Sequence, residues 1–440
     1  MGRIQQPKGD AGSGCEPSSG VFGKMCVPSD TRVRCAPRLR YIGPMNSSPR
    51  TPLPAIPRSR EDDFSKEIVE ARRALARRVT GRELPHVFGR SVAPEEARGN
   101  VENFIGFAQV PIGIAGPLLV DTSAGVREVI VPLATTEGAM VASYSRGMSW
   151  IHASGGAVAR VVREGLSQHP VLVFETINEA VAAREIALQM KPQFEAITAA
   201  ITSHGRLVEV APKVLGRRLI LRLVFTTGDA IGINMAAHAT DLCAAELAKR
   251  TQPKERYVHG QDVEKRAHAS GAIEGRGRSV GAEVVLRREL LKERARCTPE
   301  SMVAILETYR IGFAELGTQN QMVQSANGLA ALFLATGQDP AYVTESCCGQ
   351  LDFSLTDGGD LRAGVWIPSM LVGTVGGGSG QGTAAECLDL LGCRGSGTAN
   401  TFAEIAAAMV LAGDLSLMAA FCSHEFVEAH ESLGRNRPPK

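Results

Sequence analysis

The distribution of apolar residues sets the first limit on this chain, because it contains no run of 18 or more of them. The nearest approach, residues 405–413, is closed by Glu404 on one side and by Asp414 on the other. A bilayer-spanning helix needs about 20 predominantly apolar residues, so we expect a soluble protein without a membrane span. Hydrophobic residues still make up 44% of the 440 residues, enough for a large core in two or three domains. A count of 47 glycines against 5% aromatics favours closely packed small-residue helices over a β-sandwich.

The N-terminal segment differs in composition from the rest. Residues 1–60 carry ten Lys or Arg against three Asp or Glu, and nine of the 23 prolines. Because such a composition cannot bury an apolar core, residues 1–58 are predicted to be a disordered basic tail, and no secretory signal peptide is expected. The remaining 380 residues carry 38 basic and 43 acidic side chains, which disfavours nucleic acid as a partner.

The ten cysteines include no C-x-x-C pair and are accompanied by no paired-histidine motif. In a long chain without a secretory signal, such cysteines are expected to be free thiols in a reducing, cytoplasmic compartment. No metal site is predicted.

Apolar periodicity predicts the secondary structure of the remaining chain. Helical spacing indicates helices at residues 59–81 and 139–165, and the Gly and Ala content of the second would let another backbone approach closely. β-branched runs at residues 171–174 and 219–225 alternate with helix-like segments, which predicts a compact α+β unit. From residue 281 onward the pattern is mostly helical.

Two glycine-rich segments are candidates for ligand contacts. Residues 228–235 join a predicted strand to the start of a helix, where free N–H groups and the helix dipole can hold phosphate. The segment lacks the G-x-G-x-x-G spacing of a Rossmann site. Taken alone, both this segment and the glycines at 376–378 are more typical of tight turns.

Four polar residues are candidates for acid–base chemistry, namely Glu137, Lys265, Asp339 and His430. Glu137 lies in an apolar neighbourhood and Asp339 follows an apolar run, so either could instead cap a helix. Lys265 lies in a polar loop and His430 on a polar C-terminal segment, positions that are usually solvated. Their significance depends on their combination with other motifs.

Short sequence blocks recur in a family-like order and spacing over residues 60–435. They are residues 102–106 (ENFIG), 111–118, 134–138 with Ser143 and Arg146, 228–235, 273–280 (IEGRGRSV), 337–339 (GQD), 373–378 and 413–420. As a set these blocks resemble the 3-hydroxy-3-methylglutaryl-CoA (HMG-CoA) reductase family. The resemblance is greatest to the catalytic portion of its NADPH-using eukaryotic and archaeal members, without their membrane anchor.

The resemblance implies reduction of the HMG-CoA thioester to mevalonate by two hydride transfers from NADPH, with release of coenzyme A. Lys265 would stabilise the first oxyanion, and Asp339 would tune the lysine and the catalytic glutamate. Glu137 would donate a proton once the aldehyde forms, a task that needs a raised pKa. His430 would protonate the departing thiolate. The pathway implied is mevalonate supply for isoprenoids.

The fold implied by the resemblance is α+β. A large, mainly helical acyl-CoA-binding domain around a buried central helix (59–169 and 256–440) would carry an inserted small, ferredoxin-like NADP(H)-binding domain (170–255). NADPH would contact Asp229, Gly232, Asn234, Met235, Gly376 and Gly377. The acyl-CoA would contact Ser143, Arg146, Gln168, Arg266 and Asn327. The family forms its active sites at a dimer interface, so a homodimer or homotetramer is expected.

Several positions depart from the family pattern. The family's carboxylate-binding arginine aligns with Gln168, and a family histidine aligns with Gln324. A neutral amide can donate a hydrogen bond to a carboxylate but cannot neutralise it. Three interpretations follow: a reductase of the usual substrate with compensating contacts from His169 and Arg266, a reductase with altered acyl-CoA preference, or a catalytically silent regulatory or scaffolding paralogue. Retention of all four proton-transfer residues favours the first.

Overall fold

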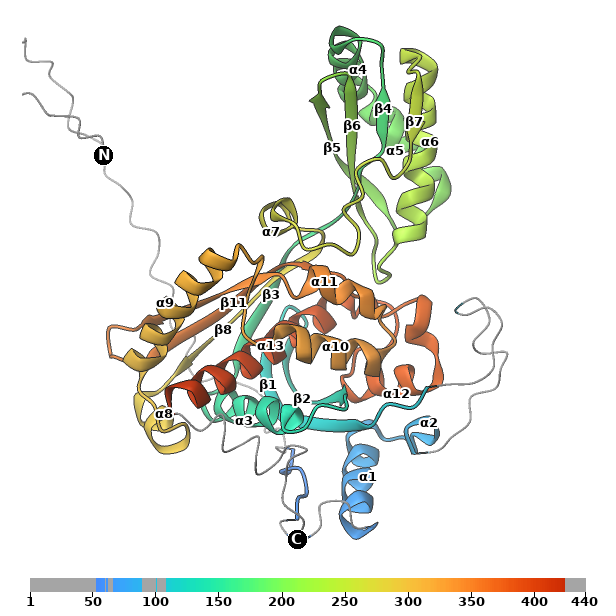
Figure 1. Cartoon of the computed structure of the whole chain (residues 1–440). Helices are drawn as coiled ribbons and strands as arrows, with labels where there is room; N and C mark the ends of the chain where they lie inside the picture. The colour runs from blue at the N-terminus through green and yellow to red at the C-terminus, as the bar shows by residue number, and fades with distance from the viewer. Residues whose placement is uncertain (1–52, 60, 62–65, 89–99, 101–107, 424–440) are drawn as a thin grey trace, which may run out of the picture. The chain divides into compact units, whose positions relative to one another are not determined.

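The computed structural model describes residues 53–59, 61, 66–88, 100 and 108–423 (Figure 1). Of the predicted tail, only residues 53–58 fall within this described part. The described chain is a mixed α+β fold built on one 11-stranded sheet that contains parallel and antiparallel pairs.

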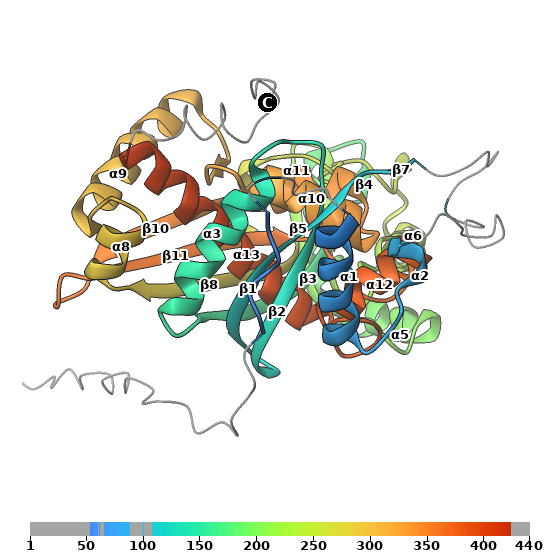
Figure 2. The same ribbon diagram turned by 90° about the horizontal axis from the view of Figure 1, so that it is seen from below.

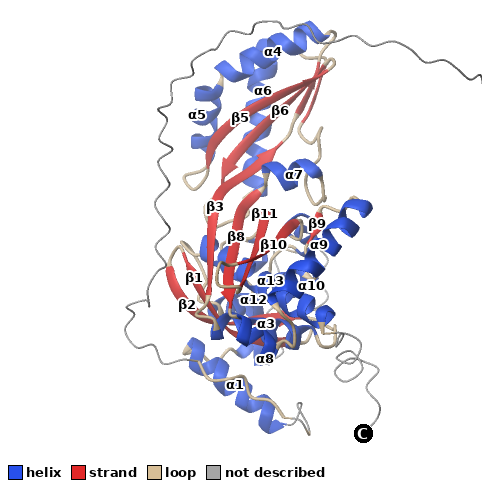
Figure 3. Cartoon of the chain, turned by 90° about the vertical axis from the view of Figure 1, so that its left-hand side faces the viewer, coloured by secondary structure: helices blue, strands red, loops and turns tan. Residues whose placement is uncertain are grey.

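The strand β3 (Ala157–Gln168) joins the two parts of this sheet (Figure 3). Residues 158–165 of β3 pair with β8, whereas residues 166–168 pair with β6. The first part contains, in spatial order, β2 (Gly125–Ala134), β1 (Ile112–Thr122), β3, β8 (Gly277–Leu286), β11 (Leu361–Met370), β10 (Gly349–Leu355) and β9 (Asn320–Gln321). The second part is centred on β6 (Arg218–Thr226) and also contains β5 (Arg206–Leu215), β4 (Val171–Val173) and β7 (Glu255–Tyr257).

The helices fall into two groups, one of which packs on the second part of the sheet. Those beside the second part are α4 (Ile177–Gln189), α5 (Lys191–Ile201) and α6 (Ile233–Thr251). The others are α1 (Lys66–Thr80), α2 (Pro85–Phe88), α3 (Met140–Ala153), α7 (Ala269–Glu274), α8 (Arg288–Arg294), α9 (Pro299–Leu316), α10 (Ser325–Thr336), α11 (Val343–Ser346), α12 (Gly382–Leu390) and α13 (Ala399–Cys422).

The helix α13 lies at the centre of the core. All of its residues from 401 to 416 are buried, and it packs against α3, α9, α10 and four strands of the first sheet part. Figure 2 shows α3 and α13 side by side. Within the described residues α13 is the one helix long and apolar enough to cross a membrane, but 83% of its most apolar window is buried inside the protein. Its apolar character is therefore that of a core helix.

Close packing of α13 against α3 depends on a glycine. A Cβ on Gly147 would lie 1.8 Å from the backbone oxygen of Ala412, so no larger residue fits there. The expectation that small residues in this region allow close backbone approach is confirmed.

Several predicted elements match the structure, including α1 with Gly81 at its end, β4, β6 and α6. The predicted helix over 139–165 is wrong beyond Ala153, because Gly155 and Gly156 adopt positive φ angles of 93° and 101° and end it before β3. The chain after residue 281 is mostly helical in its described part, as expected, although not entirely. Strands β10 and β11 lie in that stretch. Half-exposed apolar side chains such as Leu355 and Trp366 obscure the alternation of apolar and polar residues that would have indicated strands.

Candidate active site

Lys265 and Asp339 form an ion pair between two loops. Lys265 lies in the segment between β7 and α7 with a left-handed φ of 58°, and its Nζ is 2.8 Å from Oδ2 of Asp339. Asp339 also accepts a hydrogen bond from the backbone N–H of Ala341 at 2.9 Å. The hydrogen bond to Asp339 is the main cause of a raised Lys265 pKa, so the ammonium stays charged at neutral pH. With 41% of its side chain exposed, Lys265 is also accessible to a ligand.

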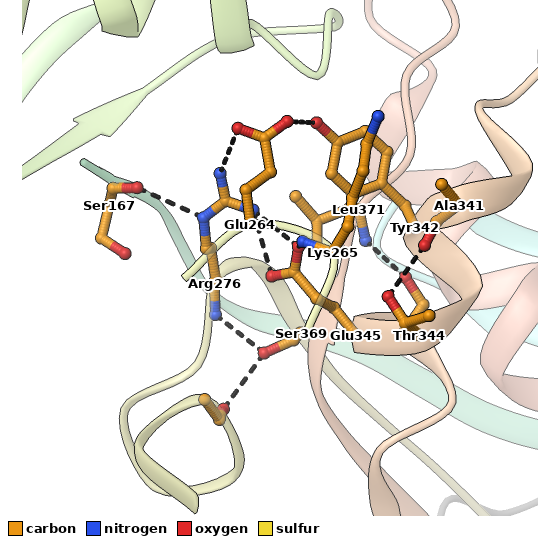
Figure 4. A network of polar contacts seen from close by, with 12 residues as sticks. Ser167, Glu264, Lys265, Arg276, Ala341, Tyr342, Thr344, Glu345, Ser369 and Leu371 are labelled. Atoms are coloured by element: carbon orange, nitrogen blue, oxygen red, sulfur yellow. Dashed lines mark hydrogen bonds and ion pairs between the residues drawn. The ribbon is translucent and has the colours of Figure 1, made fainter. Parts of the chain in front are cut away.

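A buried carboxylate anchors the backbone of this loop (Figure 4). Oε1 of Glu345, on α11, accepts the backbone N–H of Lys265 at 2.6 Å. Both oxygens of Glu345 accept hydrogen bonds from Nη1 of Arg276, at 2.8 and 3.0 Å, and Nε of Arg276 donates to the backbone oxygen of Ser167 on β3. Burial raises the pKa of Glu345, an effect that the charge of Arg276 opposes. The network ties the Lys265 loop to α11 and to the middle of the sheet.

Tyr342 and Glu264 flank Lys265. The Tyr342 hydroxyl donates a hydrogen bond to Glu264, and the Lys265 Nζ lies 5.0 Å from the centre of the Tyr342 ring. Burial and the adjacent Glu264 carboxylate raise the pKa of Tyr342, so the hydroxyl stays protonated. Sequence reasoning assigned no role to Tyr342, Glu345 or Arg276. The one available signal was the position of Arg276 in the 273–280 block.

Glu137 occupies a different position from the Lys265–Asp339 pair. It is exposed just before α3, and Nδ2 of Asn327, in the first turn of α10, donates to its two carboxylate oxygens at 3.0 and 2.7 Å. Asp339 follows the opposite end of α10. Asn327 and Thr336 are nine positions apart on this helix, about 14 Å along the axis. A single chain thus holds Glu137 and Lys265 at opposite ends of α10. The fourth predicted residue, His430, lies outside the described residues.

The predicted coenzyme A contacts cluster where α3, α10 and α13 meet. Ser143 and Ser416 place their hydroxyl oxygens 3.0 Å apart, and Nε of Arg146 donates to the Ser416 hydroxyl at 2.9 Å. Nε2 of Gln324, at the position where the resemblance implies a histidine, donates to the Ser143 hydroxyl at 3.2 Å and to the backbone oxygen of Gly413. Gln324 therefore connects the beginning of α10 to both neighbouring helices.

The residues expected at the substrate carboxylate are neutral or already paired. Gln168 and His169 are buried at the end of β3, and the Nε2 atom of each lacks a hydrogen-bond partner among the described residues. Burial lowers the pKa of His169 to about 4, so the imidazole is neutral at physiological pH and cannot replace a cationic arginine. Arg266 is exposed and forms a 2.8 Å ion pair with Asp262. The compensating contacts expected from His169 and Arg266 stay a prediction, and a contact from His169 would be that of a neutral imidazole.

The two glycine-rich segments lie against each other. The backbone oxygen of Asp229 accepts the N–H of Thr374 at 2.8 Å, and its carboxylate accepts the N–H groups of Gly397 and Ala399 at the beginning of α13. The helix α6 begins at an uncapped Gly232 with a φ of 81°. Of the remaining predicted cofactor contacts, Asn234 is exposed and Met235 is half-buried. Gly376 and Gly377 are exposed, and a Cβ at either would meet none of the described atoms within 4 Å.

A cavity of about 630 Å³ opens elsewhere, on β4, β6 and β7. Its lining includes Arg217, Arg218, Gly260 and Gln261. Oε1 of Gln261 is hydrogen-bonded to Nδ1 of His169. The cavity does not include the Lys265–Asp339 pair. Within the described ranges, no three His, Cys, Asp or Glu side chains are grouped so that they could hold a metal ion.

Comparison with known proteins identifies the family of this chain. The family model for hydroxymethylglutaryl-coenzyme A reductase matches residues 68–435. The chain is 39% identical over 373 residues to a 3-hydroxy-3-methylglutaryl-coenzyme A reductase of Methanothermobacter thermautotrophicus, covering 84% of this chain and 94% of the relative. A relative of the same name from Haloferax volcanii is 40% identical over 377 residues, covering 83% and 92%.

A similar fold is found in a solved structure. The class II 3-hydroxy-3-methylglutaryl-CoA reductase of Streptococcus pneumoniae, bound to NADPH, matches with a TM-score of 0.62 at 20% identity, covering 78% of this chain and 96% of that one. The family model and the archaeal relatives together show that the chain belongs to the hydroxymethylglutaryl-coenzyme A reductase family.

Proposed function

We propose that this protein reduces HMG-CoA to mevalonate, consuming two NADPH and two protons per thioester and releasing two NADP⁺ and free coenzyme A. The observation that carries the proposal is the accessible Lys265 ammonium, paired with Asp339 at 2.8 Å on a loop that buried Glu345 anchors. A thioester carbonyl that receives a hydride becomes an oxyanion. A fixed cation beside the oxygen stabilises this negative charge and so lowers the activation barrier of hydride transfer. The names of the archaeal relatives support this substrate.

The roles of Lys265, Asp339 and Glu137 follow from their contacts, and the role of His430 follows from the family resemblance. Lys265 stabilises the developing oxyanion, and Asp339 holds the ammonium in place and keeps it charged. Glu137, oriented by two hydrogen bonds from Asn327, delivers the proton to the aldehyde oxygen. His430 protonates the coenzyme A thiolate. Ser143 and Arg146 contact the coenzyme A arm, since a guanidinium suits phosphate recognition.

The surroundings of α6 fit an anionic dinucleotide. Its N-terminus has no side-chain cap, so free N–H groups and the positive end of the helix dipole face outward from Gly232. Gly376 and Gly377 expose a backbone without side chains on the adjacent loop. We assign NADP(H) binding to the unit 170–255 together with this loop, and acyl-CoA binding to 59–169 and 256–440. When bound, NADPH supplies the hydride.

A second copy of the chain completes the site in this proposal. Asn327, which contacts Glu137, lies about 14 Å along α10 from Thr336, and Asp339, which pairs with Lys265, follows that end of the helix. At this spacing we do not expect one chain to bring Glu137 and Lys265 to the same carbonyl. A homodimer, or a tetramer of two dimers, brings Glu137 of one copy to Lys265 of the other. We place the enzyme in the cytoplasm, in mevalonate supply for isoprenoids.

The test is NADPH oxidation at 340 nm with HMG-CoA, together with titration of released coenzyme A thiol. We expect two NADPH consumed per thiol released, and no measurable turnover for Lys265→Ala. Lys292→Ala, which removes an exposed lysine of α8, is the matched control and should keep full activity. A folded protein that oxidises neither NADPH nor NADH with HMG-CoA would refute the reductase assignment and favour a silent paralogue.

Altered acyl preference is a second candidate, and the neutral Gln168–His169 pair supports it. A distal carboxylate that faces two uncharged groups gains less binding free energy than one that faces an arginine. The reason is that charge-assisted hydrogen bonds are about twice as strong as hydrogen bonds between neutral groups. Gln168→Arg should lower KM for HMG-CoA with little change in kcat if the carboxylate binds there. Higher kcat/KM for an acyl-CoA that lacks the distal carboxylate would establish the second candidate. An unchanged KM in the variant would place the carboxylate elsewhere.

A further inference from the structure

One tyrosine side chain contacts both of the consecutive residues Glu264 and Lys265. Tyr342 ends the short 3₁₀ turn η2 (Pro340–Tyr342) and is only 4% exposed. Its hydroxyl donates a hydrogen bond to Oε1 of Glu264, and the Lys265 Nζ lies over its ring, 5.0 Å from the centre (Figure 4). The tyrosine therefore binds a carboxylate at its polar end and an ammonium at its aromatic face.

The backbone of the Lys265 loop has a conformation that permits both contacts. Lys265 has a φ of 58°, a left-handed conformation that is uncommon for a residue with a side chain. The hydrogen bond from its N–H to buried Glu345 at 2.6 Å stabilises this bend. Successive side chains of an extended segment point to opposite sides, whereas here the side chains of Glu264 and Lys265 reach the same tyrosine.

Tyr342 provides the one hydrogen bond that the Glu264 side chain accepts from the described residues. The other carboxylate oxygen of Glu264 lies 3.8 Å from Nη2 of Arg276, beyond hydrogen-bond distance, and that nitrogen has no hydrogen-bond partner in the described part of the chain. Glu264 also attracts the Lys265 ammonium, since its charge contributes to the raised pKa of the lysine. Without the Tyr342 hydroxyl, Glu264 is therefore expected to turn toward the ammonium.

A second carboxylate on Lys265 would weaken the role proposed for this lysine. The ammonium has three N–H donors, and Asp339 accepts one of them at 2.8 Å. The developing oxyanion needs another of these donors and a positive charge that no further carboxylate neutralises. The ring of Tyr342 attracts the ammonium without adding a negative charge beside it.

We propose that Tyr342 is a positioning residue for thioester reduction, whose hydroxyl holds Glu264 away from Lys265 so that the ammonium keeps a free N–H group for the substrate oxygen. The ring of Tyr342 holds the same ammonium beside Asp339. This role rests on the proposed function and deepens it, because it explains how one cation stays available although three carboxylates lie near it. Tyr342 acts through Lys265 and Glu264 and does not touch the reacting atoms.

The first test is the turnover of full-length Tyr342→Phe with NADPH and HMG-CoA. Phenylalanine keeps the ring but removes the hydroxyl, so Glu264 is free to pair with Lys265. We expect kcat to fall about tenfold, less than the 10²–10³ typical for loss of an oxyanion donor, with little change in KM. Tyr309→Phe, which removes the hydroxyl of a half-buried tyrosine on α9, is the matched control and should keep the parent kcat.

A second substitution separates this role from a purely structural one. In the double variant Tyr342→Phe/Glu264→Gln, residue 264 is a neutral amide that cannot neutralise Lys265, so kcat should recover about fivefold relative to Tyr342→Phe. Changing Glu264 would not repair lost packing or a displaced loop. A double variant no more active than Tyr342→Phe would overturn the proposal, and so would a Tyr342→Phe protein with the parent kcat.

The reactivity of the Lys265 amine gives a readout that does not depend on turnover. Acetic anhydride reacts with the deprotonated amine, so the labelling rate of residue 265, measured by peptide mass mapping, reports its pKa. Asp339 has the largest effect on this pKa, followed by Glu264 and Glu345. At pH 9 the labelling rate should be about threefold lower in Tyr342→Phe and should return to the parent value in the double variant.

The two readouts distinguish failure of this inference from failure of the proposed function. A parent protein without turnover would refute the reductase assignment, while the labelling rates would still report whether the Tyr342 hydroxyl keeps Glu264 from Lys265. An unchanged labelling rate in Tyr342→Phe would overturn the role of Tyr342 even in an active reductase.

Discussion

Two acidic side chains inside the apolar helix α13 have different environments. Glu404 is fully buried and accepts three hydrogen bonds, from the backbone N–H and hydroxyl of Ser123 and from the N–H of Val161, at 2.9–3.0 Å. Asp414 is equally buried. Its Oδ1 accepts the Gln324 N–H at 2.9 Å, but its Oδ2 has no hydrogen-bond partner among the described residues. Burial raises the pKa of Asp414 to about 7.

This environment predicts a pH-dependent stability. The folded-state pKa of Asp414 lies above its unfolded value of 3.8, so the native state holds the proton more tightly. Its stability contribution is complete below the unfolded pKa and is lost as pH rises between about 4 and 7. Asp414→Asn removes this titration. The free energy of unfolding of the variant, measured in urea, should therefore rise relative to the parent as pH increases through that window. Parallel pH profiles for the two proteins would contradict the assigned environment.

At the scale of secondary-structure elements, contact between α3 and α13 positions much of the site. Gly147 and Gly413 lie at this contact, and a Cβ on Gly413 would come within 2.4 Å of the Tyr144 ring. The Tyr144 hydroxyl in turn donates to the backbone oxygen of Gln324 at 2.6 Å. The spacing of the two helices thus determines where α10 begins, and with it the position of Asn327.

Gly147→Ala should lower the free energy of unfolding by about 3 kcal/mol, because overpacking a rigid backbone contact forces the helices apart. Gly312→Ala is the matched control. Gly312 is an exposed residue of α9 with none of the described atoms within 4 Å of a new Cβ, so alanine there should stabilise the protein by up to about 1 kcal/mol. Urea unfolding of both variants measures the effect. A Gly147→Ala protein as stable as the control would show that the helices can separate freely.

At the scale of the whole molecule, α10 acts as a spacer between two half-sites. The Glu137–Asn327 contact lies at its beginning, and the Lys265–Asp339 pair lies beyond its end. In the proposed mechanism, neither half-site alone supplies both an oxyanion-stabilising cation and a proton donor. The proposed pairing of two copies brings opposite ends of two α10 helices together.

Mixing two inactive variants tests this pairing. Glu137→Gln and Lys265→Ala should each be inactive alone, but co-expression should restore about a quarter of the parent activity. Random pairing makes half of the dimers mixed, and each mixed dimer holds one intact site of two. NADPH oxidation by the purified mixture measures the recovery. If Glu137 and Lys265 acted within one chain, no mixture would regain activity.

Sequence reasoning succeeded where a local pattern is sufficient. The β-branched run over 219–225 and the helical pattern after it became β6 and α6, because both are short-range features. The strands after residue 281 were missed because some of their outward side chains are apolar, which weakens the alternation of apolar and polar residues typical of a strand. The chemistry of Lys265 came from resemblance to a family. Its anchor Glu345 had no sequence signal, because its role depends on contacts with residues 69 and 80 positions away.

The continuity of β3 has a practical consequence for protein engineering. The strand belongs to both parts of the sheet, and Arg276 binds its backbone near the crossover. A chimera that exchanges the segment around α4–α6 for one from another reductase cannot be cut within residues 157–168 without severing the sheet. Workable splice points lie after Gln168 and before the Lys265 loop, so a transplanted segment must reproduce the pairing of β6 with the last three residues of the host strand.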